Sequence, residues 1–181
     1  MSTDLTPSDV VGFWKEAGPK MWFAKDDAFD DLFRQRFAHG HMMAARRELD
    51  HWAETPEGSL ALLILLDQFP RNAFRGTAHQ FATDPLARHF AVQAADAGQD
   101  RLMGAELQSF FYLPFEHSED IRDQDRAVAL YDAGPGDEGG WAAKHRDVIR
   151  RFGRFPHRNR ALGRETTPDE QAFLDGGGFG G

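Results

Sequence analysis

One nearly continuous apolar segment constrains the fold of this chain more than any other feature. Residues 58–69, GSLALLILLDQF, are apolar on almost every side of a helix, which suits a helix buried in the middle of a bundle. A buried strand is the alternative for so short an apolar run. No neighbouring segment alternates polar and apolar residues or forms a hairpin turn that would supply a partner strand. We therefore predict a central buried helix.

Signals for further helices recur along the chain, whereas strand signals do not. A capping residue followed by proline predicts helix starts at Thr6-Pro7, Asp84-Pro85 and Thr167-Pro168. Apolar residues at helical spacing predict further helices, which cover residues 26–37, 104–112 and 141–152, with another beginning after Ser118-Glu119-Asp120. The glycine-rich segment AGPGDEGG, residues 133–140, is expected to be a loop. The sequence therefore predicts an all-α fold.

The apolar stripes of these helices indicate which side chains face the core. The first stripe consists of Phe29, Leu32, Phe33 and Phe37, and a second follows with Met42, Ala45, Leu49 and Trp52. Ile121, Val128 and Tyr131 are expected on the inner face of the helix after Asp120. His145 lies on the apolar stripe of the 141–152 helix, and we expect a hydrogen-bonded core residue there rather than a ligand.

The length of 181 residues suits a single helical domain, residues 1–181, with a core of about 7–175 and a loose glycine-rich tail at 176–181. The chain has no cysteine, which excludes disulfides, thiolate metal sites and cysteine nucleophiles and favours the cytoplasm. The N-terminus lacks the pattern of a secretory signal, and the longest apolar run, Leu60 to Leu66, is too short to cross a bilayer. No membrane partner is expected.

The charge is unevenly distributed along the chain. A net charge of −8 and a pI near 5.4 argue against nucleic acid as a partner, because that role requires a net basic face. Residues 144–164 nevertheless carry eight basic residues against one acid, Asp147. This basic segment is expected to pack against acidic helices of the same chain, such as residues 116–125. The alternative is an anion site.

A motif occurs twice in the chain. The stretches FPRNAFRGT (residues 69–77) and FPHRNRALGRET (residues 155–166) each follow an expected helix, and each precedes a proline-initiated one. The repetition suggests stacked helical hairpins or an ancient duplication. In both copies proline would end the preceding helix and phenylalanine would plug its end into the core. The arginines and asparagines that follow could satisfy the last helix carbonyls, which is the structural alternative to a ligand role.

Four long segments carry a family resemblance. LDQFPRNAFRGT, FATDPLA, FFYLPFEHSED and HRDVIRRFGRFPHRNRALGRETTPDEQAFL are similar to the bacterial family catalogued as domain of unknown function 924, and the likeness runs from about Val10 to Leu174. The resemblance implies a single domain of stacked antiparallel helices similar to tetratricopeptide-repeat arrays, with no assigned substrate, cofactor or mechanism. No regular repeat of about 34 residues is present, so the implied likeness is in helix stacking.

Three polar clusters fall at predicted helix ends, and antiparallel helices would bring such ends together. Our first hypothesis is a pocket at this point that binds a small anionic molecule. The proposed anion contacts are Arg71, Arg154 and Arg158; the hydrogen-bonding amides are Asn72 and Asn159; the orienting carboxylates are Asp67 and Glu116; and the candidates for catalytic proton transfer are His117 and His157. A capped helix N-terminus at Ser118 would add to the attraction for the anion.

Two other functions remain open at this stage. A helical array of this kind can act as a protein or peptide interaction module through a concave groove. A metal-dependent, hydrolase-like enzyme is a further alternative, with ligands drawn from Glu116, His117, Asp120, His145 and His157. No histidine has the HExxH or Glu-x-x-His spacing of a helix-borne metal site, so we assign no metal ligand and no cofactor. Whether the protein is an enzyme stays open.

Overall fold

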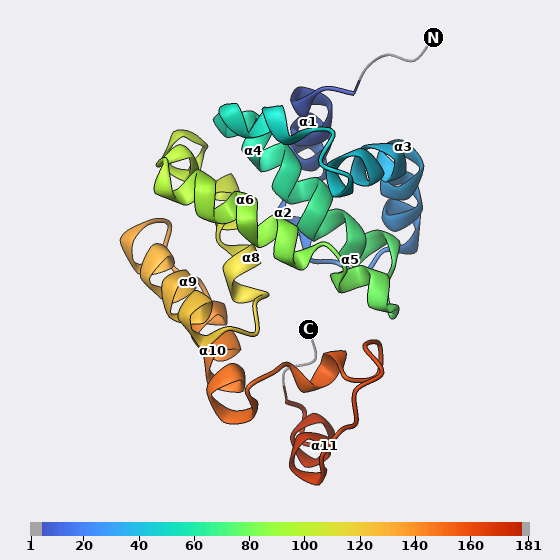
Figure 1. Ribbon diagram of the computed structural model, residues 1–181, viewed down its shortest axis with the longest axis vertical. Helices are drawn as coiled ribbons and strands as arrows, with labels where there is room; N and C mark the ends of the chain where they lie inside the picture. The colour runs from blue at the N-terminus through green and yellow to red at the C-terminus, as the bar shows by residue number, and fades with distance from the viewer. Residues whose placement is uncertain (1–4, 179–181) are drawn as a thin grey trace.

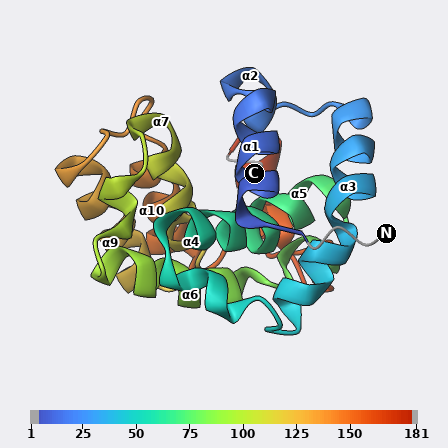
Figure 2. The ribbon, with the colours of Figure 1, turned by 90° about the horizontal axis from the view of Figure 1, so that it is seen from above.

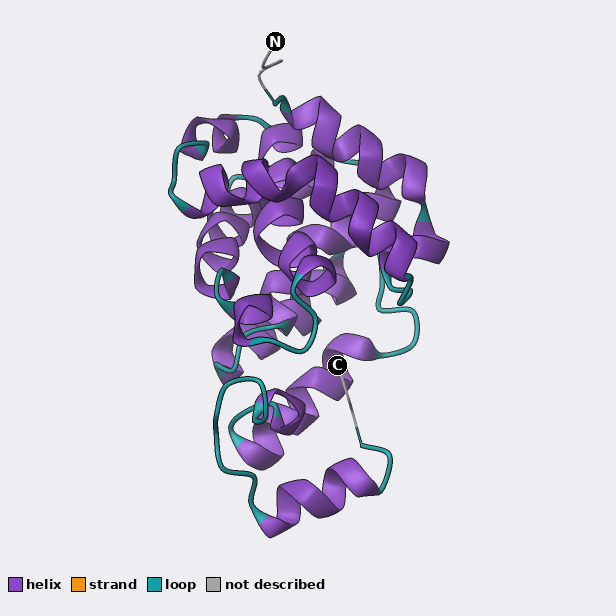
Figure 3. Cartoon of the chain, turned by 90° about the vertical axis from the view of Figure 1, so that its right-hand side faces the viewer, coloured by secondary structure: helices purple, strands orange, loops and turns teal. Residues whose placement is uncertain are grey.

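The computed structural model describes residues 5–178, and over that range the chain is built from helices and connecting turns without a strand (Figures 1 and 3). This confirms the all-α fold. Among the described residues no helix is long and apolar enough to cross a membrane. The tetratricopeptide-like stacking stays a prediction, as does the single-domain boundary. Of the tail expected to be loose, residues 179–181 lie outside the described part of the chain.

The helices follow one another closely along the chain. The N-terminal part contains α1 (Pro7–Ala17), α2 (Pro19–Trp22), α3 (Asp27–Ala45), the 3-10 turn η1 (Asp50–Glu54), α4 (Pro56–Leu63), the π turn η2 (Ile64–Gln68), α5 (Phe69–Ala73), the 3-10 turn η3 (Ala78–Phe81) and α6 (Asp84–Asp96). The C-terminal part contains η4 (Gln99–Leu102), α7 (Ala105–Gln108), η5 (Ser109–Phe111), α8 (Leu113–Glu116), α9 (Ile121–Ala133), α10 (Trp141–Phe152), η6 (Pro156–Arg158) and α11 (Pro168–Asp175).

The predicted central helix is present and deeply buried. Helix α4, η2 and α5 form one continuous helical rod, and each side chain from Leu60 to Leu66 is at most 1% exposed. The rod packs against α1, α3 and α6, and Figure 2 shows α4 lying among these helices. Burial on all sides explains why the segment is apolar all round. The capping boxes predicted at Thr6 and Thr167 are confirmed as well.

The expected helix stop at Phe69-Pro70 is wrong. The rod passes through the π turn η2, which ends at Gln68, and continues through this pair as α5. Pro70 has no N–H to donate to the carbonyl of Leu66, four residues earlier. The backbone widens just before it, with the N–H of Phe69 bonded to the carbonyl of Ile64. The hydroxyl of Thr83 donates to the Leu66 carbonyl at 2.5 Å, and His41 contacts the Leu65 carbonyl at 2.9 Å. Side chains outside the rod thus provide hydrogen-bond partners for carbonyl groups at the π turn.

Several expected core positions lie at the surface. Leu32, Met42, Ile121 and Trp141 are between 37% and 51% exposed. The two stripes of residues 29–52 belong to one long helix, α3, and the turn η1, and only part of each stripe meets the core. The helix expected over residues 104–112 is instead broken into short turns whose aromatic side chains are buried.

The C-terminal part packs onto α4 and α6 through η4, η5 and α8. Helix α10 lies along α9, and a small second core of Val148, Ile149 and Phe155 joins α10 to the segment that carries α11. The basic segment pairs with acids of its own chain, as expected: Arg150 contacts Asp125. In the same way Arg164 contacts Glu119. Figure 1 shows the segment after α10 returning beneath α5.

The central rod gives a direct test of the packing. We expect Leu62→Ala to lower the free energy of unfolding by about 2–5 kcal/mol, because its side chain is fully buried and would leave a cavity. Leu102→Ala is the matched control: this side chain is 73% exposed, and its loss should cost no more than about 0.5 kcal/mol. Urea unfolding followed by circular dichroism measures both values. Equal losses in the two variants would contradict the burial described here.

Candidate functional site

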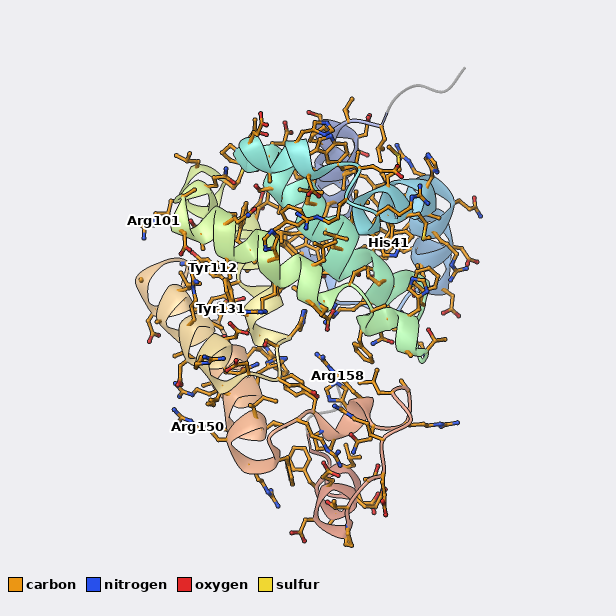
Figure 4. The ribbon with its side chains drawn as sticks, in the orientation of Figure 1. His41, Arg101, Tyr112, Tyr131, Arg150 and Arg158 are labelled. Carbon is orange, nitrogen blue, oxygen red and sulfur yellow. The ribbon has the colours of Figure 1, made fainter. Side chains whose placement is uncertain are left out.

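A large cavity lies where the N-terminal helices, α8, α9, α10 and the C-terminal segment meet. Its volume is about 1290 Å³. The polar side chains that line it include Arg71, Glu116, His117, Tyr131, His157 and Arg158. Figure 4 shows Arg158 between the C-terminal segment and the helices above it, with Tyr131 on α9 to one side. Six of the nine residues proposed from sequence for the pocket, Asn72 included, therefore line one cavity.

Asp84 joins the arginines of the two motif copies. Arg71 donates from Nη1 to Oδ1 of Asp84 at 2.8 Å and from Nη2 to Oδ2 at 3.1 Å. Arg158 donates from Nη1 to the same Oδ2 at 3.2 Å. Asp84 is the first residue of α6, so one carboxylate at a helix start connects α5 to η6, and Arg158 lies 74 residues after it along the chain.

Arg158 is held rigidly in an apolar setting. Its guanidinium lies 4.6 Å from the ring centroids of both Phe81 and Phe155. Burial and the neighbouring Arg71 lower the pKa of Arg158 to about 10. Its Nε donates to no acceptor among the described residues. The charge of Arg158 is therefore disfavoured, and a bound anion would offset that penalty.

His117 is oriented by Asp67. The Nδ1 of His117 lies 2.7 Å from Oδ1 of Asp67, whose other oxygen accepts from Gln68 at 2.6 Å. Burial would raise the pKa of Asp67, but Arg71 and His117 lower it to about 2, so this carboxylate is ionised. Burial and Arg71 lower the pKa of His117. A neutral imidazole that donates from Nδ1 to Asp67 keeps Nε2 free of a proton, as a base or acceptor requires.

Glu116 is a buried carboxyl poised to titrate near neutral pH. Burial raises its pKa to about 7, and Asp137 and Asp67 add to the rise against an opposing hydrogen bond from Tyr131. His145 lies beside it, with Nδ1 3.3 Å from Oε2 of Glu116 and 2.8 Å from the carbonyl of Trp141. Burial lowers the pKa of His145 to about 4, so the imidazole in this contact is neutral. A carboxyl with such a pKa can both give and take a proton.

His157 also lines the cavity as a neutral imidazole. Burial and the adjacent Arg158 lower its pKa to about 3. The expected core role of His145 is consistent with its 8% exposure and its hydrogen bond, yet this side chain lines the cavity as well. The cavity wall therefore offers three uncharged imidazoles beside the guanidiniums of Arg71 and Arg158 at neutral pH.

The structure does not bring Arg154 and Asn159 to the cavity. Arg154 donates to Glu170 at 2.6 and 2.8 Å, and the Asn159 amide donates to the same carboxylate at 3.2 Å. Asn72 lines the cavity, but its amide donates to Asp30 at 2.7 Å. The anion contact expected for Arg154 is replaced by an ion pair that holds α11 against the preceding turn. Both asparagines likewise serve packing, although their partners are carboxylates rather than helix carbonyls.

The expected anion site at a helix N-terminus after Ser118 is wrong. Helix α9 begins at Ile121, and its cap is Asp120, which accepts from the N–H of Arg122. The Ser118 hydroxyl donates to Asp123 at 2.6 Å. Carboxylates already occupy this helix end, and their charge would repel an anion.

Sequence reasoning missed the residues that complete the cluster: Asp84, Gln68, Phe81 and Tyr131. The sequence around Asp84 indicates only a helix start, although two buried arginines require a carboxylate partner. The spacing of Tyr131 in its helix indicates only that its side chain faces the core. Among residues 5–178 no group of three or more histidine, cysteine, aspartate or glutamate side chains is placed to hold a metal ion.

The fold and the cavity define a class of all-helical protein with a buried arginine, histidine and carboxylate cluster. The chain belongs to the family described as bacterial protein of unknown function (DUF924), whose model matches residues 10–178. It is similar to the solved structure of the protein of unknown function ATU0120 from Agrobacterium tumefaciens, with 56% identity over 94% of this chain and 97% of that chain and a TM-score of 0.91. A comparison with curated proteins finds no match.

The raised pKa of Glu116 predicts a specific pH dependence of stability. The unfolded carboxyl ionises near 4.5 and the folded one near 7, so its contribution to stability is lost as pH rises between these values. Glu116→Gln removes this titration. We expect the stability of the glutamine variant, relative to the parent, to rise by about 2 kcal/mol between pH 5 and pH 8, measured by urea unfolding. The histidines titrate equally in both proteins, so a difference independent of pH would contradict the assignment.

Proposed function

We propose that the cavity binds a small organic anion through Arg71 and Arg158. The observation that carries the proposal is the pair of guanidiniums that share Asp84 in the wall of one cavity. Guanidiniums recognise carboxylate and phosphate with directed donors, and their charge counts for more where water is excluded. The two arginines come from separate parts of the chain, so the anion would bind where the folded structure brings them together.

The distribution of charge supports an anion rather than a cation. Asp67 is 1% exposed, and neither Asp67 nor Asp84 is among the residues that line the cavity, whereas both arginines are. The carboxylates therefore lie behind the guanidiniums from the viewpoint of a ligand. Asp137 does line the cavity, but its two oxygens accept from the N–H groups of Trp141 and Ala142 at 2.7 and 2.9 Å. With Glu138, Asp147 and Glu116 it gives four carboxyl groups in the lining, of which Glu116 is partly protonated near neutral pH. Five cationic side chains face them, because Arg75, Lys144 and Arg151 line the cavity besides Arg71 and Arg158.

The neutral acid–base groups beside the arginines support a reaction on the bound anion as a further hypothesis. His117, oriented by Asp67, can accept a proton, and Glu116 can donate one near neutral pH. Their environments shift the two pKa values in opposite directions, raising that of Glu116 and lowering that of His117, so the carboxyl can act as the proton donor and the imidazole as the acceptor. Of the two candidates for proton transfer, His117 has the better orientation, because its ring is fixed by a carboxylate at 2.7 Å.

An interaction module that binds a protein or peptide has less support. Exposed large apolar side chains such as Leu32, Leu102 and Leu162 belong to separate elements of the chain. Two others, Phe23 and Trp141, line the cavity already described. A peptide site would need a continuous apolar or charged row on one face, and these positions do not share one element.

Binding can be tested by thermal unfolding with pyrophosphate as the probe. At a concentration of about 100 times its dissociation constant it should stabilise the protein by about 2.7 kcal/mol and raise Tm by several degrees. Arg158→Gln should remove this shift, because it deletes one of the two guanidiniums. Arg154→Gln is the matched control, since Arg154 lies in the same segment but contacts Glu170, and it should keep the shift.

A second variant gives an independent test in case Arg158→Gln fails to fold. Arg71→Gln removes the other guanidinium of the pair, and it should also remove the shift. Loss of the shift in all three variants, or in none, would contradict an anion site built from Arg71 and Arg158. Far-UV circular dichroism of each variant shows whether the helical fold is kept.

A further inference from the structure

The cavity is larger than a simple inorganic anion requires. Pockets that enclose organic ligands commonly measure about 300–1,000 Å³. At about 1290 Å³ this cavity has room for a phosphate group together with a substantial organic body. The two arginines that would hold the anion account for only part of its lining, so the remaining wall indicates what the rest of the ligand is.

Aromatic rings make up most of the large apolar side chains in that remaining wall. Its aromatic members are Trp22, Phe23, Phe81, Trp141 and Phe173, besides Tyr131, whereas Leu113 and Val148 are its branched aliphatic ones. A cavity for an acyl chain would be expected to show the reverse balance. Aromatic rings contribute a large contact area and stack with a planar partner at ring separations of about 4.5–7 Å.

Two of these rings are exposed to an unusual degree for their size. Phe23 is 70% exposed and Trp141 is 51% exposed, although sixteen phenylalanines and four tryptophans otherwise largely fill the core. Phe23 is held parallel to Phe110, with ring centroids 6.1 Å apart. The ammonium of Lys144 lies 4.3 Å from the Trp141 ring. Each ring is thus positioned by a neighbour while part of its surface remains open.

We propose that the anion bound in this cavity carries a planar aromatic body, as nucleoside monophosphates and aryl phosphates do. The phosphate contacts Arg71 and Arg158, and the ring packs against the exposed aromatic surface of Phe23 or Trp141. Gln68 and Gln80, which also line the cavity, offer amide groups to the edge of a base. The inference rests on the proposed anion site and names the class of its ligand.

The test compares two phosphates that differ by an aromatic base. Isothermal titration calorimetry with adenosine 5′-monophosphate and with ribose 5-phosphate gives the two dissociation constants. Stacking of one base on an aromatic side chain is worth about 1–3 kcal/mol, so we expect the nucleotide to bind at least about fivefold more tightly. Phe23→Ala and Trp141→Ala should each be tested, and at least one should reduce that advantage to about twofold or less while ribose 5-phosphate binds as before.

Controls separate this inference from the proposed function. Leu102→Ala removes an exposed apolar side chain outside the cavity lining, and it should leave both affinities unchanged. Equal affinities for the two phosphates, both lost in Arg158→Gln, would overturn the aromatic ligand and retain the anion site. A nucleotide advantage that survives both alanine variants would also overturn the stacking contact. Failure of both phosphates to bind would overturn the anion site itself.

Discussion

The double ion pair at Asp84 is the interaction on which the arrangement of the molecule depends. One carboxylate at the start of α6 receives Arg71 from α5 and Arg158 from η6, and so fixes the C-terminal segment against the N-terminal helices. Removal of a buried partner of this kind leaves uncompensated charge and typically costs 3–5 kcal/mol. The same contact sets the two guanidiniums side by side in the cavity wall. Stability of the docking and the electrostatics of the cavity therefore have a single origin.

The π turn η2 positions Asp67 and Gln68, which belong to the same polar cluster as the two arginines. Pro70 cannot complete an α-helical hydrogen bond, and the widened turn before it contains both Asp67 and Gln68. Asp67 then reaches His117 while its backbone carbonyl accepts from Arg71 at 2.8 Å. An ideal helix through this segment would turn these side chains to other directions. The irregular backbone is stable because surrounding side chains satisfy its carbonyls.

The sequence predicted the helices well because apolar periodicity and proline-associated caps are local signals. The central helix, the two capping boxes and the pairing of the basic segment with acids of the same chain all followed from it. The predicted polar clusters placed Arg71, His117 and Arg158 correctly at helix ends, and the structure gathers them around one cavity. The sequence could not identify Asp84 as the shared partner of the two arginines, because that partner depends on the path of the chain between distant segments. For the same reason Arg154 was assigned to the anion, although Glu170 lies within 2.6 Å of it.

The two copies of the Phe-Pro motif show which of their polar residues the fold already uses. In the first copy Asn72 and Arg75 both donate to Asp30; in the second, Asn159 donates to Glu170 together with Arg154, the residue directly before this copy. Each copy thus anchors itself with one asparagine, one arginine and one carboxylate. Arg71 and Arg158, which directly precede those asparagines, take no part in either anchor. They point instead to a common carboxylate at the cavity, and Arg158 keeps a buried donor that no described protein group accepts. Anchoring of each motif copy does not require these two arginines; their shared contact with Asp84 instead docks the C-terminal segment and places both guanidiniums in the cavity wall.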